Sequence, residues 1–280
     1  MSYAYASANL CSGLAAGAFV FSAGLNDATR TRLNDTRMSS RYVNGAAVAS
    51  GLSFTIDLGS AIPTSALALL NTNCAVQKND ATVRIRGGTA AAGGLVTAGI
   101  VTAKAASTLN PAAPYNKDHV FQYTPITKQF LEVLFTWTGT VTNFAIGEVW
   151  AMVQTTLARK SIYGGGEDEE IASASVGFDN GGTRSTFKGG PLRSQRLPFS
   201  DLNLTERREQ ATMWRATRGD VQPFIWIDSV EATATAAAIT EQAVIFGKLQ
   251  VPKYAWSEPD YALFDPSELL IRSLSREVGS

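Results

Sequence analysis

The stretch Phe54-Thr55-Ile56-Asp57-Leu58, which ends at Gly59-Ser60, alternates apolar and polar residues with a period of two. That period is typical of a β-strand with one buried face. Other short segments alternate in the same way or are continuously apolar, and turn residues separate them: residues 66–70, 81–86, 130–137 and 144–151. The sequence therefore predicts a mainly β fold, with a β-sandwich or a barrel over residues 1–158.

A second, smaller domain is predicted over residues 159–280. Three glycines at 164–166 meet four acidic residues at 167–170, and such a segment favours an exposed linker. Beyond it, the pattern predicts strands near residues 172–178, 183–199, 224–227 and 243–249. One helix is predicted near residues 204–218, with Asn203 or Thr205 as its N-cap and Gly219 at its end.

The chain carries few charges, and they balance. Among 280 residues there are 24 Lys and Arg and 24 Asp and Glu, which make up 17% of the chain. A typical domain has about 25% charged residues. This composition argues against a nucleic-acid partner, which requires many basic contacts to phosphate, and it suits a chain that packs within an assembly.

No membrane insertion is predicted, because no apolar run approaches the roughly 20 residues that cross a bilayer. The apolar start of the chain has no Lys or Arg before Arg30, so a secretory signal is not expected.

The residue patterns predict no enzyme. The lone His119 has no metal-binding or nucleophilic motif around it, and we expect an exposed imidazole in a loop. The glycine strings lack the spacing of a phosphate-binding loop. Glu132 and Glu148 are isolated carboxylates in predicted strands, so a hydrolase with paired acids is disfavoured. Cys11 and Cys74 are too few for a disulfide framework and are interpreted as reduced thiols.

Several motifs of the first half occur in a recognisable order: Arg32-Leu33-Asn34-Asp35, then residues 54–59, then Ile146-Gly147-Glu148-Val149-Trp150. This order resembles the discoidin-like, galactose-binding-type jelly roll. The second half contains RSQRLPFSDLNLTERREQATMWRATRG (193–219), PFIWID (223–228) and FGKLQVPKYAW (246–256). Together with the jelly-roll motifs, these segments resemble tail or tail-tip structural proteins of tailed bacteriophages.

The resemblance implies a non-enzymatic component of a phage virion, such as a tail, tail-tip or fibre-adaptor protein, which is assembled in the cytoplasm of the host bacterium. Its partners would be other copies of itself and other virion tail proteins. Arginine and aromatic residues commonly anchor protein contacts, although core packing explains them equally. The interface residues predicted on this basis are Arg207, Trp214, Arg215, Trp226, Tyr254 and Trp256.

Two further possibilities follow from the resemblance. Some jelly rolls of this type bind Ca²⁺ through an early-loop Asp and a Glu near the last strand, which here are Asp35 and Glu148; no other cofactor is implied. The alternative function is that of a carbohydrate-binding module that recognises host surface glycans. Its loops would include the Ala/Gly/Thr-rich surface excursion at residues 90–116, which contains no aromatic residue before Tyr115.

Overall fold

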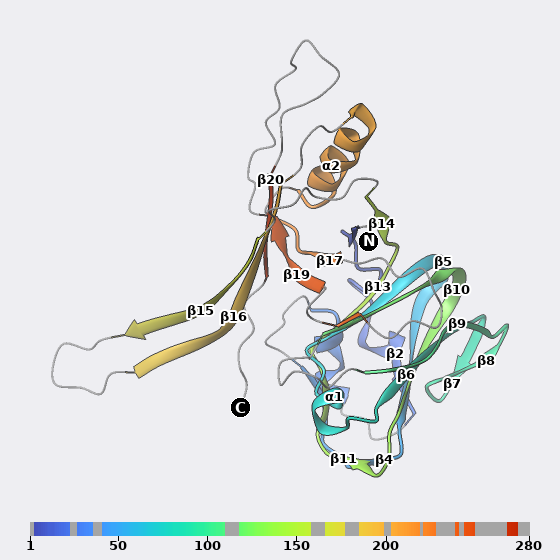
Figure 1. Cartoon of the computed structure of the whole chain (residues 1–280). Helices are drawn as coiled ribbons and strands as arrows, with labels where there is room; N and C mark the ends of the chain where they lie inside the picture. Colours follow the sequence, from blue (N-terminus) through green and yellow to red (C-terminus); the bar gives the residue numbers. More distant parts are fainter. Residues whose placement is uncertain are drawn as a thin grey trace. The chain divides into compact units, whose positions relative to one another are not determined.

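The computed structural model describes residues 3–22, 27–35, 41–109, 118–157, 166–176, 185–198, 203–218, 221–227, 239–240, 244–249 and 268–273. The chain divides into two compact units (Figure 1). The sandwich unit comprises Ala8–Thr155 and Asp228–Val244, and the second unit comprises Met1–Ser7, Thr156–Ile227 and Ile245–Ser280. Strands dominate both units, which confirms the predicted mainly β fold class.

The main sheet of the sandwich unit has the strand order β13-β5-β10-β6-β9, and all its neighbouring pairs are antiparallel. Its strands have these bounds: β13 (Glu148–Met152), β5 (Leu52–Leu70), β10 (His119–Thr136), β6 (Thr82–Gly88) and β9 (Val101–Thr108). Two short strands, β2 (Phe19–Phe21) and β18 (Ile239–Thr240), pair with β5 and β10 respectively.

The long strand β5 joins two segments that the sequence predicts as separate strands. Its buried ends, around Ile56 and Leu67, are linked by exposed residues 59–61, and the pairing with β10 shifts register in this region. Gly59 has a φ of +77° there, and its N–H donates to Oδ1 of Asp57 at 2.8 Å. The backbone thus bends at the predicted turn, as expected for Gly59 and Asp57, but it stays within one extended strand.

Shorter elements cover the sheet and complete the core. They include β3 (Tyr42–Asn44) paired with β12 (Phe144–Ile146), β4 (Val48–Ala49) paired with β11 (Thr140–Val141), the helical turns η1 (Ala16–Ala18) and η2 (Asp27–Leu33), and the short helix α1 (Cys74–Gln77). Aromatic rings join these elements to the sheet, since Phe21 stacks on both Tyr42 and Phe54 with centroid distances of 4.4 and 4.9 Å. The short elements and the sheet therefore share one buried apolar core.

Residues 90–109 form ordered strands, whereas the sequence predicts a long surface excursion there. β7 (Ala90–Ala92) pairs with β8 (Leu95–Ala98) in a small hairpin, and β9 follows at the edge of the main sheet. The alternation that marks a strand is weak here because Ala, Gly and Thr differ little in polarity. Residues 110–117 lie outside the described part.

The second unit is built on a sheet of order β14-β1-β17-β19-β20-β16-β15. Its strands have these bounds: β14 (Thr155–Thr156), β1 (Ala4–Ala6), β17 (Phe224–Ile227), β19 (Val244–Leu249), β20 (Glu268–Ser273), β16 (Ser185–Pro198) and β15 (Gly166–Val176). Helix α2 (Leu204–Ala216), the one long helix among the described residues, lies where the sequence predicts a helix. The two units divide between residues 155 and 156, the first seven residues belong to the second unit, and residues 228–244 belong to the sandwich unit.

In the described part of the chain, no helix is both long and apolar enough to cross a membrane.

Candidate assembly surface

Helix α2 begins at a complete capping box. The Oδ1 of Asn203 accepts a hydrogen bond from the N–H of Glu206 at 3.0 Å, and Oε2 of Glu206 accepts one from the N–H of Asn203 at 2.8 Å. Two backbone donors at the helix start are thereby satisfied. Asn203 is thus the N-cap, one of the two candidates predicted. At the other end, Arg218 takes the left-handed conformation, with φ of +51°. Gly219, the predicted end of the helix, lies outside the described residues.

The inner face of α2 is buried against the sheet of the second unit. Arg207, Gln210 and Met213 are buried, and Trp214 is half-buried. Met213 packs in a cluster with Phe224 and Trp226.

The residues predicted as interface positions differ in burial where the structure describes them. Trp226 is fully buried and lies 5.1 Å from the ring of Tyr3, so it is a core residue of its own chain. Arg207 is on the buried face of α2, one turn from Gln210, so the helical phase places it inward. Arg215 is exposed. Tyr254 and Trp256 lie outside the described residues.

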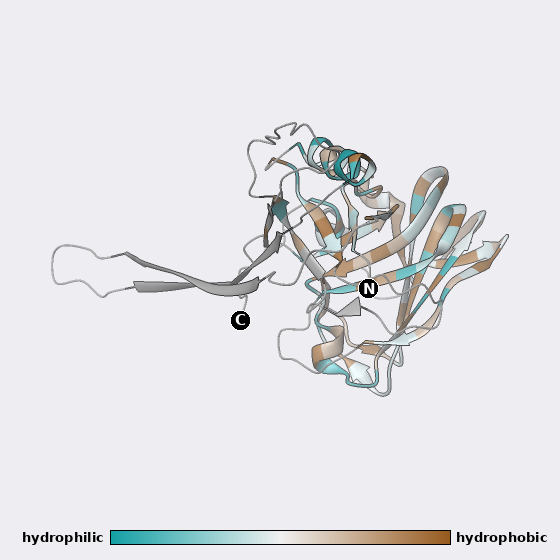
Figure 2. Cartoon of the chain, turned by 45° about the horizontal axis from the view of Figure 1, so that its top comes forward, coloured by the Kyte–Doolittle hydropathy of each residue, from teal (hydrophilic) through white to brown (hydrophobic). Residues whose placement is uncertain are grey.

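The outer face of α2 combines apolar and cationic side chains. Leu204 is 51% exposed, Arg208 and Arg215 are exposed, and Ala211 is half-buried. Positions 204, 208, 211 and 215 follow the spacing of a single helical stripe, because residues three and four apart are neighbours on a helix surface. Figure 2 shows hydrophilic residues along this helix. Arg208 was not among the predicted positions, although its spacing of seven residues from Arg215 could have identified it.

The four acidic residues at 167–170 lie in strand β15, which corrects the prediction of a solvated linker. Their partners in β16 follow from the register, in which Glu169 is opposite Arg193, Asp168 opposite Ser194 and Glu170 opposite Leu192. Among the four acidic residues, only Glu169 is at a register position opposite a basic residue. β15 is the last strand of its sheet.

The β15–β16 pair extends past the rest of its sheet as a two-stranded ribbon (Figure 1). β20 pairs with β16 only over residues 194–198, whereas β15 pairs with β16 from Gly166↔Arg196 to Val176↔Ser185. Within the described part of the chain, residues 169–176 and 185–193 therefore pair only with each other.

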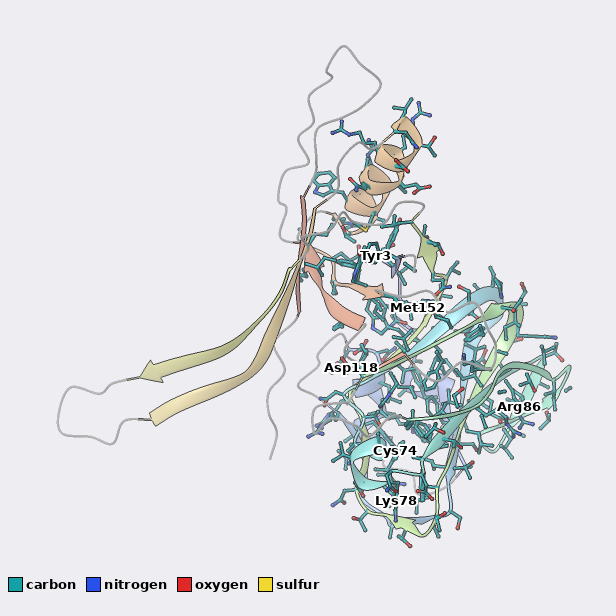
Figure 3. The ribbon with its side chains drawn as sticks, in the orientation of Figure 1. Tyr3, Cys74, Lys78, Arg86, Asp118 and Met152 are labelled. Atoms are coloured by element: carbon teal, nitrogen blue, oxygen red, sulfur yellow. The ribbon has the colours of Figure 1, made fainter. Side chains whose placement is uncertain are left out.

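In the sandwich unit, the β7–β8 hairpin is fixed by a buried carboxylate. Glu132 accepts hydrogen bonds from Nε and Nη2 of Arg86 at 2.8 and 2.7 Å, and from the N–H of Val96 at 2.7 Å. Figure 3 labels Arg86 beside this hairpin. Glu132, weighed as an isolated candidate acid, is thus a structural carboxylate whose oxygens are occupied.

The outer side of the same region is apolar and uncharged. Leu95, Ile100 and Val101 are 40%, 48% and 40% exposed. Between Arg86 and Lys117 the only charged residue in the sequence is Lys104, and its side chain is buried.

The two predicted calcium residues, Asp35 and Glu148, differ in burial. Glu148 is fully buried, and its Oε1 lies 3.5 Å from Nδ2 of Asn9; Asp35 is half-buried just after η2. The neighbouring Asn34 donates from Nδ2 to the carbonyl oxygens of Cys11 and Leu14, at 2.7 and 2.9 Å.

Ca²⁺ takes six to eight oxygen ligands. In the described residues, no group of three or more His, Cys, Asp and Glu gathers at a single point. The calcium site at Asp35 and Glu148 stays a prediction.

Both cysteines are buried and unpaired with each other, as predicted for reduced thiols. Burial raises the pKa of Cys11 to about 12, and the nearby Glu148 carboxylate adds to the rise. Burial likewise raises the pKa of Cys74 to about 12. A thiol with such a pKa is a poor nucleophile at neutral pH.

His119 is fully buried, which corrects the prediction of an exposed loop imidazole. It is the first residue of β10 and lies opposite Leu69 of β5 and Thr240 of β18. The polar residues that precede it concealed the start of the strand.

No protein-family model matches this sequence, and no curated protein matches it. Among solved structures, it is similar to chitosan-binding module 1 of a chitosanase/glucanase from Paenibacillus sp. IK-5, with 18% identity and a TM-score of 0.38 over 51% of this chain and 97% of that one. It is also similar to the CBM32 of AlyQ in complex with 4,5-unsaturated mannuronic acid, with 19% identity and a TM-score of 0.34 over 48% of this chain and 93% of that one. A third similar structure is the lectin domain of lectinolysin complexed with Lewis B antigen, with 13% identity and a TM-score of 0.38 over 52% of this chain and 96% of that one.

Proposed function

We propose that this chain is a non-enzymatic assembly protein, which works through contacts with copies of itself and with neighbouring proteins. We propose further that the particle it helps to build is the tail of a tailed-bacteriophage virion. The assembly role rests on the structure, and the identity of the particle rests on the sequence resemblance described above.

The β15–β16 ribbon carries the assembly role. A two-stranded hairpin alone is at best marginally stable in water, because it has no second layer or third strand to bury its faces. In the described chain, residues 169–176 and 185–193 have no strand beyond each other. We therefore expect contact with another protein to stabilise this ribbon.

The uncharged edge of the sandwich unit supports the same role. Leu95, Ile100 and Val101 expose apolar side chains, and the buried Lys104 is the only charged residue in the sequence from 87 to 116. Apolar side chains cost little to desolvate on contact with a protein. The hairpin that presents Leu95 is held by the Glu132 carboxylate, so little conformational entropy is lost when it is covered.

Hydrogen exchange tests the assembly role directly. Amides of residues 169–176 and 185–193 should exchange within seconds to minutes in the dilute chain and become protected in the assembled particle. Amides of β5 and β10 serve as the internal control, since they should be protected in both. Ribbon amides that are equally protected in a dilute monomer would contradict the proposal.

Purified particles test the virion role. Mass spectrometry of virions from the phage or prophage that encodes the chain should find it in several copies per particle, in the tail fraction. Absence from purified virions would overturn the virion role while leaving the assembly role to the exchange experiment.

Glycan recognition by the sandwich unit is the second candidate. It is favoured by the binding modules above, whose descriptions name chitosan, mannuronic acid and Lewis B antigen. Sugar rings usually stack on exposed aromatic rings, and each aromatic residue in the described part of the sandwich unit is buried except Phe130, which is half-buried. A glycan array with the whole chain tests this candidate: specific hits would support it, and an array without hits would count against it.

A further inference from the structure

We propose that Asn44 is a deamidation site, and that separation of the β3–β12 strand pair controls how fast it reacts. The site lies in the sandwich unit and does not depend on the assembly role. Asn44 is followed by Gly45. Asparagine is a chemically labile residue, and a following glycine makes it more so, because glycine has no side chain to hinder attack by its backbone nitrogen.

The reaction needs only the chain and water. The backbone nitrogen of Gly45 attacks Cγ of Asn44 and loses its proton to water. The Cγ–Nδ2 bond then breaks, and ammonia leaves with a proton taken from water, so that a succinimide ring remains. Water opens this ring at either of its carbonyls and leaves aspartate or isoaspartate at position 44. In isoaspartate the main chain runs through Cβ and Cγ, so the backbone is longer.

The fold shields Asn44 from this attack. Asn44 is the last residue of β3 and pairs with Phe144, the first residue of β12. Its side chain is 1% exposed, and its Oδ1 accepts a hydrogen bond from the N–H of Ala46 at 3.1 Å. Attack requires the side chain to rotate towards the Gly45 nitrogen, and close packing opposes such a rotation. Reaction therefore requires β3 to separate from β12.

The β3–β12 pair is also a weak point of the sandwich unit. Both strands have three residues, and in the described part of the chain they pair only with each other. Nδ2 of Asn44 is buried without a hydrogen-bond partner among the described residues, which costs free energy that contact with water restores. We therefore expect this pair to open more readily than the main sheet.

The product cannot return to the place that the amide leaves. Opposite residues of an antiparallel pair point to the same face, so position 44 shares a face with Phe144, a core residue that stacks on Trp137. A carboxylate at this buried position would have to lose its hydration. Isoaspartate would in addition shift the register of β3. Deamidation is therefore expected to keep the strand pair open.

Deamidation rates of the whole chain test control by the fold. Peptide mapping by mass spectrometry at pH 8 follows conversion at Asn44, which should be at least about tenfold slower in the folded chain than in urea. Gly45→Ala should slow the reaction in urea about tenfold. It leaves the fold intact, because the φ of Gly45 is not left-handed and a Cβ there would meet no atom within 4 Å. Equal rates in folded and unfolded chain would overturn the proposal.

Asn73 and Asn9 offer a matched pair of substitutions. Asn73 holds the start of β12, since its Nδ2 donates to the carbonyl oxygen of Asn143 at 2.8 Å and its Oδ1 accepts from the N–H of Ala145 at 2.9 Å. Asn9 also uses both amide atoms, but outside the β3–β12 pair, and its Nδ2 donates to the carbonyl oxygen of Val149 at 3.0 Å. Both side chains are half-buried.

The two variants separate local opening from unfolding of the whole unit. Asn73→Ala should raise the rate at Asn44 in the folded chain at least about threefold, whereas Asn9→Ala should leave it within about twofold of the original. Equal acceleration by both variants would show that Asn44 reacts through unfolding of the sandwich unit, and control by the β3–β12 pair would be wrong.

Melting curves test whether the product fits the core. Asn44→Asp should melt at a lower temperature at pH 8 than Asn44→Ala, which removes the same amide without adding a charge. Equal melting temperatures would show that the folded chain accepts a carboxylate at position 44, and the expected lasting opening of the pair would be overturned.

Discussion

Arg86 binds both oxygens of the buried Glu132 carboxylate, and the same carboxylate accepts the N–H of Val96. One side chain of β10 thus joins β6 to the β7–β8 hairpin. Because Glu132 is fully buried and Arg86 is 20% exposed, the pair lies at the rim of the core rather than at its centre.

Removal of this carboxylate should be costly. We expect Glu132→Ala to lower the free energy of unfolding by about 3–5 kcal/mol, because it leaves the Arg86 charge and the Val96 N–H without their acceptor. Urea denaturation gives the value. Arg84→Met, on the same strand as Arg86, is the control and should cost under about 1 kcal/mol. A loss below about 1 kcal/mol for Glu132→Ala would mean that water replaces the carboxylate.

The turn of the β7–β8 hairpin offers a matched pair of glycines. Gly93 and Gly94 both have positive φ, of +54° and +77°. A Cβ on Gly94 would lie 2.5 Å from the backbone nitrogen of Ser22, whereas a Cβ on Gly93 would meet no atom within 4 Å.

Gly93→Ala should therefore cost only the left-handed strain of about 1–2 kcal/mol, and Gly94→Ala should cost clearly more, since the clash involves backbone on both sides. Thermal unfolding of the two variants measures the difference. Equal melting temperatures would show that the hairpin can move away from Ser22.

The buried thiols predict a specific dependence of stability on pH. Cys11 and Cys74 have a folded pKa of about 12 against an ordinary value of 9.0, so above pH 9 the unfolded chain loses protons that the folded chain retains. The stability contribution is complete below pH 9 and is lost as the pH rises from 9 toward 12.

Urea midpoints measured between pH 8 and pH 10.5 should fall more steeply for the original chain than for Cys11→Ala/Cys74→Ala. In native protein at pH 8, neither thiol should react with iodoacetamide within an hour. Rapid alkylation would show that the turn at Cys11, or the helix α1 that begins at Cys74, opens in the native protein.

The Asn34 amide should stabilise the loop that it bridges. Asn34→Ala leaves the carbonyls of Cys11 and Leu14 without this donor and should lower stability by about 1–3 kcal/mol. Melting curves with EDTA and with Ca²⁺ complete the test. If Ca²⁺ raises the melting temperature of the original chain and Asp35→Asn removes that rise, the predicted calcium site is real; unchanged curves contradict it.

Periodicity located the strands where polar and apolar residues differ strongly. It predicted the two ends of β5, the strand at Phe224–Ile227 and the Asn203-capped helix. It missed β7 and β8, whose Ala and Gly residues give no contrast, and it placed His119 in a loop because the residues before it are polar. A local pattern does not show which residues lie close in space. The four acids of β15 are typical of a linker, and only the pairing with β16 shows that they lie in a strand. Arg207 is a plausible contact residue by type, and only the packing of α2 shows that it is buried.

The second unit includes residues 1–7 and the sandwich unit includes residues 228–244, so a single cleavage between them yields two fragments that are each incomplete units. Cleavage between residues 158 and 165 would give an N-terminal fragment that carries β1, a strand of the second unit, and a C-terminal fragment that carries β18, a strand of the sandwich sheet. Each fragment would hold a strand on which the other depends. Nicked protein should therefore migrate as two bands in denaturing gels and elute as a single species from a sizing column, and neither half expressed alone should fold fully until the other is added.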